Sequence, residues 1–222
     1  VNTFFEEYFA TDFDDTEWQY PNIVVDEGQD ISDAMLEHLS FLAELNEGSF
    51  YVFYDRNQFI LERNSPEQPN YLDSRAECRL VLYRNCRNTA EIAATVGSLV
   101  DLRQEPYVND VHGEKPKAVF YSDKAAVQGS AERFVKQMQD NRVALEVMVI
   151  LSVHSLEHSA LHGVKSLAGV LVSNTLEEGK VWVTTTRKYK GLEAKAVLLV
   201  DVEVSKLTDA VMQRMLYIGG SR

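Results

Sequence analysis

The order of short apolar runs and amphipathic segments constrains the fold of this chain more than any other feature. Ile23-Val24-Val25 is a β-branched run that ends at Asp26, and a second apolar run covers residues 50–53. Residues 33–46 between them carry apolar side chains three and four positions apart, which predicts a helix with one buried face. A strand, a helix and a second strand in this order form a βαβ unit, in which the two strands are parallel.

The alternation of strand and helix patterns continues after residue 76. We expect further strands at residues 80–82, 118–120, 147–151 and 196–200, and further helices from Thr89, over 127–138 and over 208–218. The apolar runs at 147–151 and 196–200 are typical of strands covered on both faces of a sheet. Residues 63–76 contain Pro66 and Pro69 among polar residues, as a linker does. The chain is therefore expected to have an α/β fold in two unequal blocks.

The composition is that of a globular protein, because 45% of the 222 residues are hydrophobic and 25% are charged. No apolar run reaches the roughly 18 residues that a membrane-spanning helix needs, and the sequence shows no signal-peptide pattern. Cys78 and Cys86 are too few for a disulfide scaffold. We expect a cytoplasmic protein with no membrane partner.

Charge is distributed unevenly along the chain. The net charge is −12, which taken whole counts against a nucleic-acid partner. Residues 1–55 contain 14 acidic and no basic residues, however, so the rest of the chain is close to neutral. Residues 179–192 carry four basic residues and no acid, with Trp182 and Tyr189 among them. Such a stretch suits single-stranded nucleic acid, or it is a solvated basic edge with its aromatic side chains in the core.

Two adjacent carboxylates follow the first apolar run. In parallel α/β sheets ligands bind beyond the carboxyl ends of strands, which is where Asp26 and Glu27 are expected. One carboxylate there can hold Mg²⁺ and the other can accept a proton from an attacking water. The alternative is an acidic turn in which Asp30 or Ser32 caps the following helix.

Five segments, taken in chain order, resemble the motifs of superfamily 1 DNA helicases of the UvrD/Rep type. They are residues 26–30 (DEGQD, Walker B), 50–58 (FYVFYDRNQ, motif III), 82–89 (LYRNCRNT, motif IV), 183–193 (VTTTRKYKGLE, motif V) and 215–222 (MLYIGGSR, motif VI). The segment K-G-L-E is the most specific of these matches. The short second block resembles the compact members found in nuclease-related-domain proteins.

The resemblance implies a parallel-sheet P-loop NTPase (RecA-like) architecture, in which ATP is bound between two domains. Residues 1–65 would be the C-terminal part of the first RecA-like domain, with Walker B and motif III. Residues 66–78 would be a linker, and residues 79–222 the second RecA-like domain, with motifs IV, V and VI.

The resemblance also implies a role for individual residues around ATP and Mg²⁺. Asp26 would hold Mg²⁺, Glu27 would be the general base, and Gln58 would sense the γ-phosphate and the attacking water. From the second domain, Arg87 would reach the γ-phosphate and Arg222 would be the arginine finger. The ribose and the nucleotide backbone would be met by Glu193 and Gly191.

On the nucleic-acid side, Thr185, Thr186 and Arg187 would lie near the single strand, with Lys188 in the same basic cluster. The implied partner is single-stranded DNA or a DNA junction, with RNA left open. Without the motif order, Arg87 and Arg222 would each be read as surface ion-pair partners.

The sequence departs from the family in several places. The loop G-x-x-x-x-G-K-[ST], which cradles the phosphates, does not occur in it. We therefore expect the chain to be the C-terminal part of a longer protein, whose N-terminal portion supplies that loop, and to be inactive alone. Cys86 replaces the family's adenine-stacking tyrosine, and Gly28 replaces an alanine, which is expected to be a mild change.

The sequence thus predicts a fragment of an ATP-dependent DNA helicase or translocase. Two other functions remain open. One is a metal-dependent nuclease that uses Asp26, Glu27 and Asp30. The other is a degenerate RecA-like module that binds proteins and has no catalytic activity.

Overall fold

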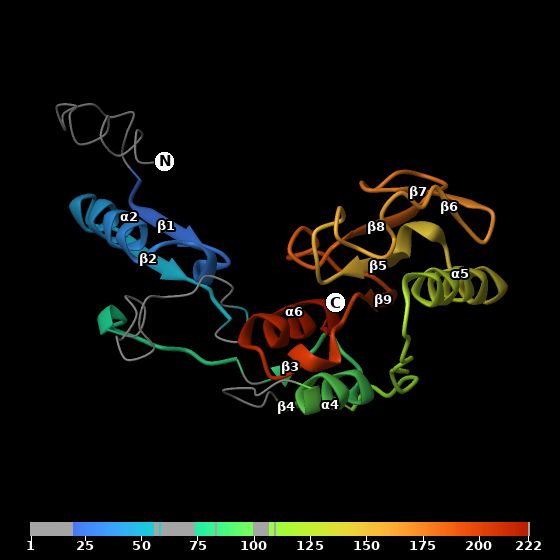
Figure 1. The fold of residues 1–222 in the computed structure, drawn as a ribbon. Helices are drawn as coiled ribbons and strands as arrows, with labels where there is room; N and C mark the ends of the chain where they lie inside the picture. The colour runs from blue at the N-terminus through green and yellow to red at the C-terminus, as the bar shows by residue number, and fades with distance from the viewer. Residues whose placement is uncertain are drawn as a thin grey trace. The chain divides into compact units, whose positions relative to one another are not determined.

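The structure is a computed structural model that describes residues 20–55, 58, 74–82, 84–99, 107–108 and 110–221. The chain divides into two compact units, Val1–Val81 and Leu82–Arg222, coloured from blue to red along the sequence in Figure 1. Each unit is described by itself. Residues 1–19 and Arg222, the residue predicted to be the arginine finger, lie outside the described residues.

The first unit contains the predicted βαβ arrangement. Strand β1 (Asn22–Val25) pairs in parallel with β2 (Ser49–Val52), and α2 (Asp33–Leu45) connects them. The helix begins at Asp33 because the Ser32 Oγ accepts a hydrogen bond from the Met35 N–H. Its apolar face packs on the sheet, where Leu36 and Val25 form a buried cluster. The prediction of parallel strands joined by a helix is confirmed.

The second unit is built around a mostly parallel sheet with the order β6-β7-β8-β5-β9 in the described residues. The strands are β5 (Met148–Ser152), β6 (Ser166–Leu167), β7 (Val170–Ser173), β8 (Val181–Thr185) and β9 (Ala196–Val200). Strand β6 is antiparallel to β7, and the other pairings are parallel. All five residues of β5 are buried, which agrees with its place between β8 and β9 inside the sheet. The predictions for residues 147–151 and 196–200 are confirmed to within one residue.

Both faces of this sheet are covered by apolar side chains. Helix α5 (Lys124–Asp140) packs against one face, where Val127, Ala131 and Val135 join Ile150 in a core. Leu199 of β9 contributes to a cluster with residues of α4 (Ala90–Leu99) and α6 (Ala210–Gly220). The predicted helices therefore form and lie close to their expected bounds (Figure 1).

Two predicted strands are absent from the structure. Residues 80–82 and 118–120 are not assigned to strands, and Leu80, Leu82 and Phe120 are largely exposed. In the described part of the second unit, the pairing near residue 82 is that of two short strands, β3 (Arg84–Asn85) and β4 (Tyr107–Val108). An apolar run is a strand only where a neighbour supplies the hydrogen bonds, and no described strand pairs with either segment.

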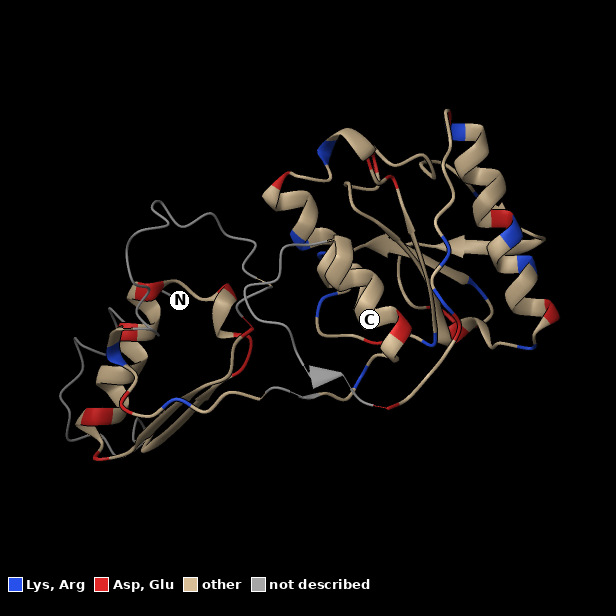
Figure 2. Ribbon diagram, turned by 90° about the horizontal axis from the view of Figure 1, so that it is seen from below, with Lys and Arg blue, Asp and Glu red and all other residues tan. Residues whose placement is uncertain are grey.

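The described helices include none that is both long and apolar enough to cross a membrane. Basic and acidic residues are interspersed along the second unit (Figure 2), whereas the described residues up to Asp55 carry acids and no Lys or Arg.

Candidate functional site

The turn after β1 holds the two predicted carboxylates at the carboxyl end of the strand. Asp26 is exposed, and its Oδ1 accepts a hydrogen bond from the Glu27 N–H at 2.9 Å. Glu27 has a left-handed backbone, with φ of 54°. The Gly28 N–H donates to the Phe53 carbonyl at 2.8 Å, which draws the turn against the end of β2.

Gly28 is more constrained than the sequence suggested. A Cβ on this residue would lie 2.3 Å from Val52 Cγ1, which is far inside van der Waals contact. The close approach of the turn to β2 therefore leaves no space for a side chain. The glycine therefore permits the contact between the two strand ends.

A buried glutamine joins the ends of the two strands. Gln29 is 1% exposed; its Nε2 donates to Glu27 Oε2, and its Oε1 accepts from the Asp55 N–H at 3.1 Å. The Asp55 carboxylate in turn accepts from Gln58 Nε2 at 2.8 Å. We call Glu27, Gln29, Asp55 and Gln58 the strand-end network. It places the predicted base Glu27 and the predicted sensor Gln58 at one end of the same sheet.

Sequence reasoning did not single out Gln29 or Asp55. Both lie in the segments that resemble Walker B and motif III, but their residue types alone do not distinguish a bridge from a surface turn. The sequence feature that could have pointed to Gln29 is its position, because it is a polar residue between Gly28 and the start of an apolar helix.

The carboxylate of Asp26 at the end of β1 is the ligand predicted for Mg²⁺. The described residues include no group of three or more His, Cys, Asp or Glu side chains that could hold a metal ion. Mg²⁺ is commonly bound through one or two carboxylates together with substrate phosphates and waters. Asp26, exposed at the carboxyl end of β1, fits an ion that arrives with phosphate groups and does not by itself form a protein cage.

In the second unit, the structure brings together the residues predicted at motifs IV and V. Arg87 Nε lies 2.5 Å from Glu193 Oε1, and the side chains are 43% and 60% exposed. Arg87 belongs to a turn in which the Asn85 Oδ1 accepts from the N–H groups of Arg87 and Asn88. Gly191, two residues before Glu193, has φ of 83°, a backbone conformation that favours glycine.

The residues predicted to meet nucleic acid divide into exposed and buried positions. Arg187 and Lys188 are exposed, and Thr185 is half-buried with its Oγ1 accepting from the Lys188 N–H. Thr186 is 1% exposed, and its hydroxyl donates to the Met215 sulfur at 3.1 Å. Thr186 therefore holds α6 against the sheet and is not at the surface that the prediction assigned to it.

The aromatic residues of this segment belong to the core. Tyr189 is buried with Val149 and Leu151, and its ring meets that of Trp182 edge-on at 5.1 Å. The Trp182 Nε1 donates to the Asn174 carbonyl. These contacts match the alternative in which the basic residues are solvated and the aromatic residues are structural.

A further polar cluster was not predicted. Asp201 directly follows β9, is 8% exposed and has φ of 66°. Its carboxylate accepts from Ser152 Oγ and Ser159 Oγ, each at 2.6 Å, and from the Ala160 N–H at 2.9 Å. Asp201 thus fastens the loop after β5 to the end of β9. The same sequence pattern that pointed to Asp26, a carboxylate directly after an apolar strand, could have pointed to Asp201.

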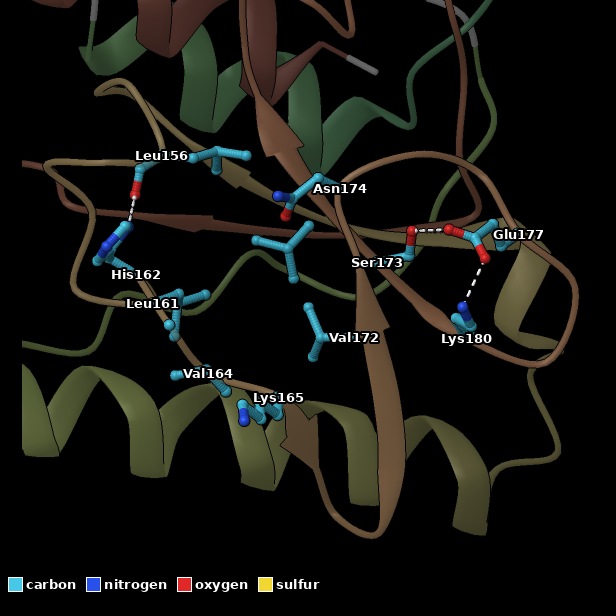
Figure 3. A pocket seen from close by; sticks show the side chains of 12 residues that line it. Leu156, Leu161, His162, Val164, Lys165, Val172, Ser173, Asn174, Glu177 and Lys180 are labelled. Carbon is cyan, nitrogen blue, oxygen red and sulfur yellow. Dashed lines mark hydrogen bonds and ion pairs between the residues drawn. The ribbon is translucent and has the colours of Figure 1, made fainter.

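A pocket of about 450 Å³ lies between that loop and β7 (Figure 3). Leu156, Leu161 and Val172 give it an apolar wall, and Ser173, Glu177 and Lys180 form a hydrogen-bonded group beside it. The Lys180 ammonium and the Ser173 hydroxyl lower the pKa of Glu177 to about 2. None of the residues predicted to bind the nucleotide lines this pocket.

No protein-family model and no curated protein matches the chain.

Proposed function

We propose that this chain is part of an ATP-dependent DNA helicase or translocase of superfamily 1. In such a motor, ATP hydrolysis between two RecA-like domains drives movement on single-stranded DNA. The observation that carries the proposal is the strand-end network, in which Gln29 connects Glu27 to Asp55 and Gln58. The contact between Arg87 and Glu193 supports it from the second unit.

The described residues suit the chemistry of phosphoryl transfer to water. Glu27 would accept the proton of the attacking water, and the hydrogen bond from Gln29 holds its carboxylate in place. Gln58, fixed by Asp55, would position that water or contact the phosphate. The Arg87 guanidinium would stabilise charge on the phosphate oxygens. Mg²⁺, held by Asp26 with the nucleotide, would neutralise phosphate charge.

The 222 residues contain no G-x-x-x-x-G-K-[ST] loop. Because that loop supplies the backbone N–H groups and the lysine that hold the phosphates, the proposed motor needs it from residues outside this sequence. We therefore expect no appreciable ATP turnover by the 222-residue chain alone. Mg²⁺-dependent turnover by this chain that Glu27→Gln abolishes would contradict that expectation.

The experiment that tests the proposal measures ATP hydrolysis by the full-length protein containing this chain, with and without single-stranded DNA. DNA should stimulate hydrolysis, and Glu27→Gln should lower the turnover about 100-fold or more because the proton acceptor is lost. Glu37→Gln, which removes an exposed carboxylate of α2, is the matched control and should leave turnover unchanged.

Other results of these measurements would favour the nuclease or the non-catalytic module over the motor. DNA cleavage that needs Mg²⁺ but no ATP would assign the nuclease that uses Asp26, Glu27 and Asp30. A protein that neither hydrolyses ATP nor binds single-stranded DNA would be an interaction module. Turnover that is indifferent to Glu27→Gln would remove this residue from the proposed mechanism.

A further inference from the structure

The pocket between the loop after β5 and strand β7 is separate from the residues that the proposed function uses (Figure 3). It belongs wholly to the second unit, and its volume of about 450 Å³ is within the range of small-molecule sites. Such sites combine a largely apolar lining with a few polar groups that fix the orientation of the ligand. The lining residues therefore indicate which chemistry the pocket accepts.

The two sides of the pocket are held in place by different contacts. On the side of the loop, the Leu161 N–H donates to Ser159 Oγ at 3.1 Å, and Ser159 is itself bound to the carboxylate that follows β9. On the side of β7, the Ser173 hydroxyl donates to Glu177, and the Thr175 N–H donates to the Ser173 oxygen at 3.2 Å. A ligand that enters the pocket therefore has little of the protein to order, which favours affinity.

Aliphatic side chains form the middle of the pocket. In Figure 3, Leu161, Val164 and Val172 lie between the imidazole of the loop on the left and the hydrogen-bonded group beside β7 on the right. These side chains offer no hydrogen bond, so the part of a ligand that lies against them has to be apolar. Because side chains alternate along a strand, Val172 lines the pocket whereas its neighbour Leu171 does not and is 59% exposed.

The charged groups around this apolar middle do not cancel. Glu177 supplies the one carboxylate among the lining residues, and it is paired with the Lys180 ammonium at 2.5 Å. Lys165, on the other side of the pocket, is exposed and makes no ion pair with any described residue. Two lysines thus face one carboxylate, which leaves one positive charge in excess, and the His162 imidazole adds to it when protonated.

We propose that this pocket binds a small organic anion, whose apolar body lies against Leu161 and Val172 and whose anionic group lies at Lys165. The carboxylate of Glu177 already engages Lys180, so Lys165 supplies most of the attraction. A carboxylate and a phosphate monoester are two anions with this chemistry. The pocket is independent of the proposed motor, because none of the residues predicted to bind nucleotide or nucleic acid lines it.

The test titrates the 222-residue chain with 1-naphthoate and with naphthalene-1-methanol, which has nearly the same shape and no charge. Amide chemical shifts of residues 161–165 and 172–180 locate the binding and give both affinities. Naphthoate should bind about two- to fivefold more tightly than the alcohol, because one exposed ion pair contributes about that much. Tighter binding of 1-naphthyl phosphate than of naphthoate assigns the ligand to the phosphate monoesters, and the reverse order assigns it to the carboxylates.

Two substitutions of charged residues should change this preference in opposite directions. Lys165→Gln should remove the preference for naphthoate over the alcohol. Glu177→Gln releases the Lys180 ammonium from its ion pair and should tighten naphthoate binding by about two- to fivefold. Lys136→Gln, at an exposed position of α5 that does not line the pocket, makes the same charge change as Lys165→Gln and should leave the preference unchanged.

A substitution in the apolar middle tests the location. Val172→Phe places a ring in the space that the ligand would occupy and should abolish binding of both naphthalene compounds. Leu171→Phe adds the same ring to the neighbouring residue of β7, outside the lining, and should leave both affinities unchanged.

Several results would overturn the proposal. Equal affinities for naphthoate and the alcohol in the unmodified chain, or a preference that survives Lys165→Gln, would remove the anionic group from Lys165. Shifts confined to other residues, or no binding of either compound at millimolar concentration, would remove the site. Because Lys165 and Glu177 are both exposed, their glutamine variants give this answer even where Val172→Phe unfolds the unit.

Discussion

At the scale of single residues, the turn after β1 depends on three neighbours with different tasks. Glu27 adopts a left-handed backbone, which non-glycine residues keep only where the surroundings hold them. The Asp30 N–H donates to the Glu27 carbonyl at 2.9 Å, and the buried Gln29 holds the Glu27 carboxylate. Gly28 lets the turn approach β2, and its N–H reaches the Phe53 carbonyl.

Replacing Gly28 with alanine should therefore destabilise the first unit. The new Cβ would overlap Val52 Cγ1 at 2.3 Å, and overpacking of this kind costs about 1–3 kcal/mol. Urea unfolding followed by the signal of the first unit measures the change.

Gly129→Ala is the matched control for this prediction. Gly129 lies inside α5, and a Cβ there would meet only Arg133 Nη1, at 3.6 Å. Because alanine favours helix over glycine, this variant should gain about 0.5–1 kcal/mol. Equal effects from the two substitutions would contradict the role given to the space around Gly28.

At the scale of elements, a charged residue attaches the segment before α5 to helix α4. The Glu91 carboxylate, in the first turn of α4, accepts from the Gly113 N–H and contacts His112 Nδ1, both at 2.8 Å. The Gly113 N–H, followed by His112, lowers the pKa of Glu91 from 4.5 to about 2. The bond from the Ala90 N–H to the Val111 carbonyl reinforces the same connection.

This lowered pKa predicts a pH dependence of stability. Between pH 4.5 and about 2 the unfolded chain binds a proton at Glu91 that the folded chain does not, so stability rises with pH in that window. The contribution of Glu91 is complete above pH 4.5 and is lost as the pH falls toward 2. Glu91→Gln should therefore differ from the unmodified chain in melting temperature at pH 6, and the difference should disappear near pH 2.

Glu132→Gln, at an exposed position of α5, is the control for the pH series. It should give a small difference that does not change between pH 6 and pH 2. If the difference in melting temperature between Glu91→Gln and the unmodified chain is constant with pH, the charge of the carboxylate does not hold the segment before α5 to α4.

At the scale of the whole molecule, the separation of charge along the chain bears on the proposed DNA partner. Residues 1–55 contain 14 acidic and no basic residues and so account for the negative sign of the net charge of −12, whereas Arg187 and Lys188 are exposed on the second unit. Binding to single-stranded DNA is driven by local phosphate contacts and the release of counterions. The total charge of the chain therefore predicts its DNA affinity poorly.

Under the proposed function, Lys188→Gln should weaken binding of single-stranded DNA and reduce its salt dependence. Loss of one phosphate contact lowers the slope of log K against log salt by about 0.7 on a single strand. Lys136→Gln makes the same charge change on the exposed side of α5 and should leave the slope unchanged. Fluorescence anisotropy across a salt series measures both, and equal slopes for the two variants would place the DNA elsewhere.

Several features of this fold were determined by the sequence alone. The βαβ order and the strands at residues 148–152 and 196–200 follow from local periodicity, because a repeat of 3.6 residues or a continuous apolar run has few other solutions. The position of Asp26 and Glu27 at a strand end followed from the same pattern. The carboxylates of Asp26 and Glu27 make that end of β1 polar whatever the rest of the fold is.

Only the tertiary structure decided which side chains face inward. Residues 80–82 and 118–120 have strand composition, but no described strand pairs with them. Thr186 and Tyr189 lie in a basic segment and are nevertheless buried against α6 and the sheet. Gln29 reaches Asp55 across 26 positions of sequence. Each of these outcomes depends on a neighbour that is remote in the chain, and local periodicity contains no information about such neighbours.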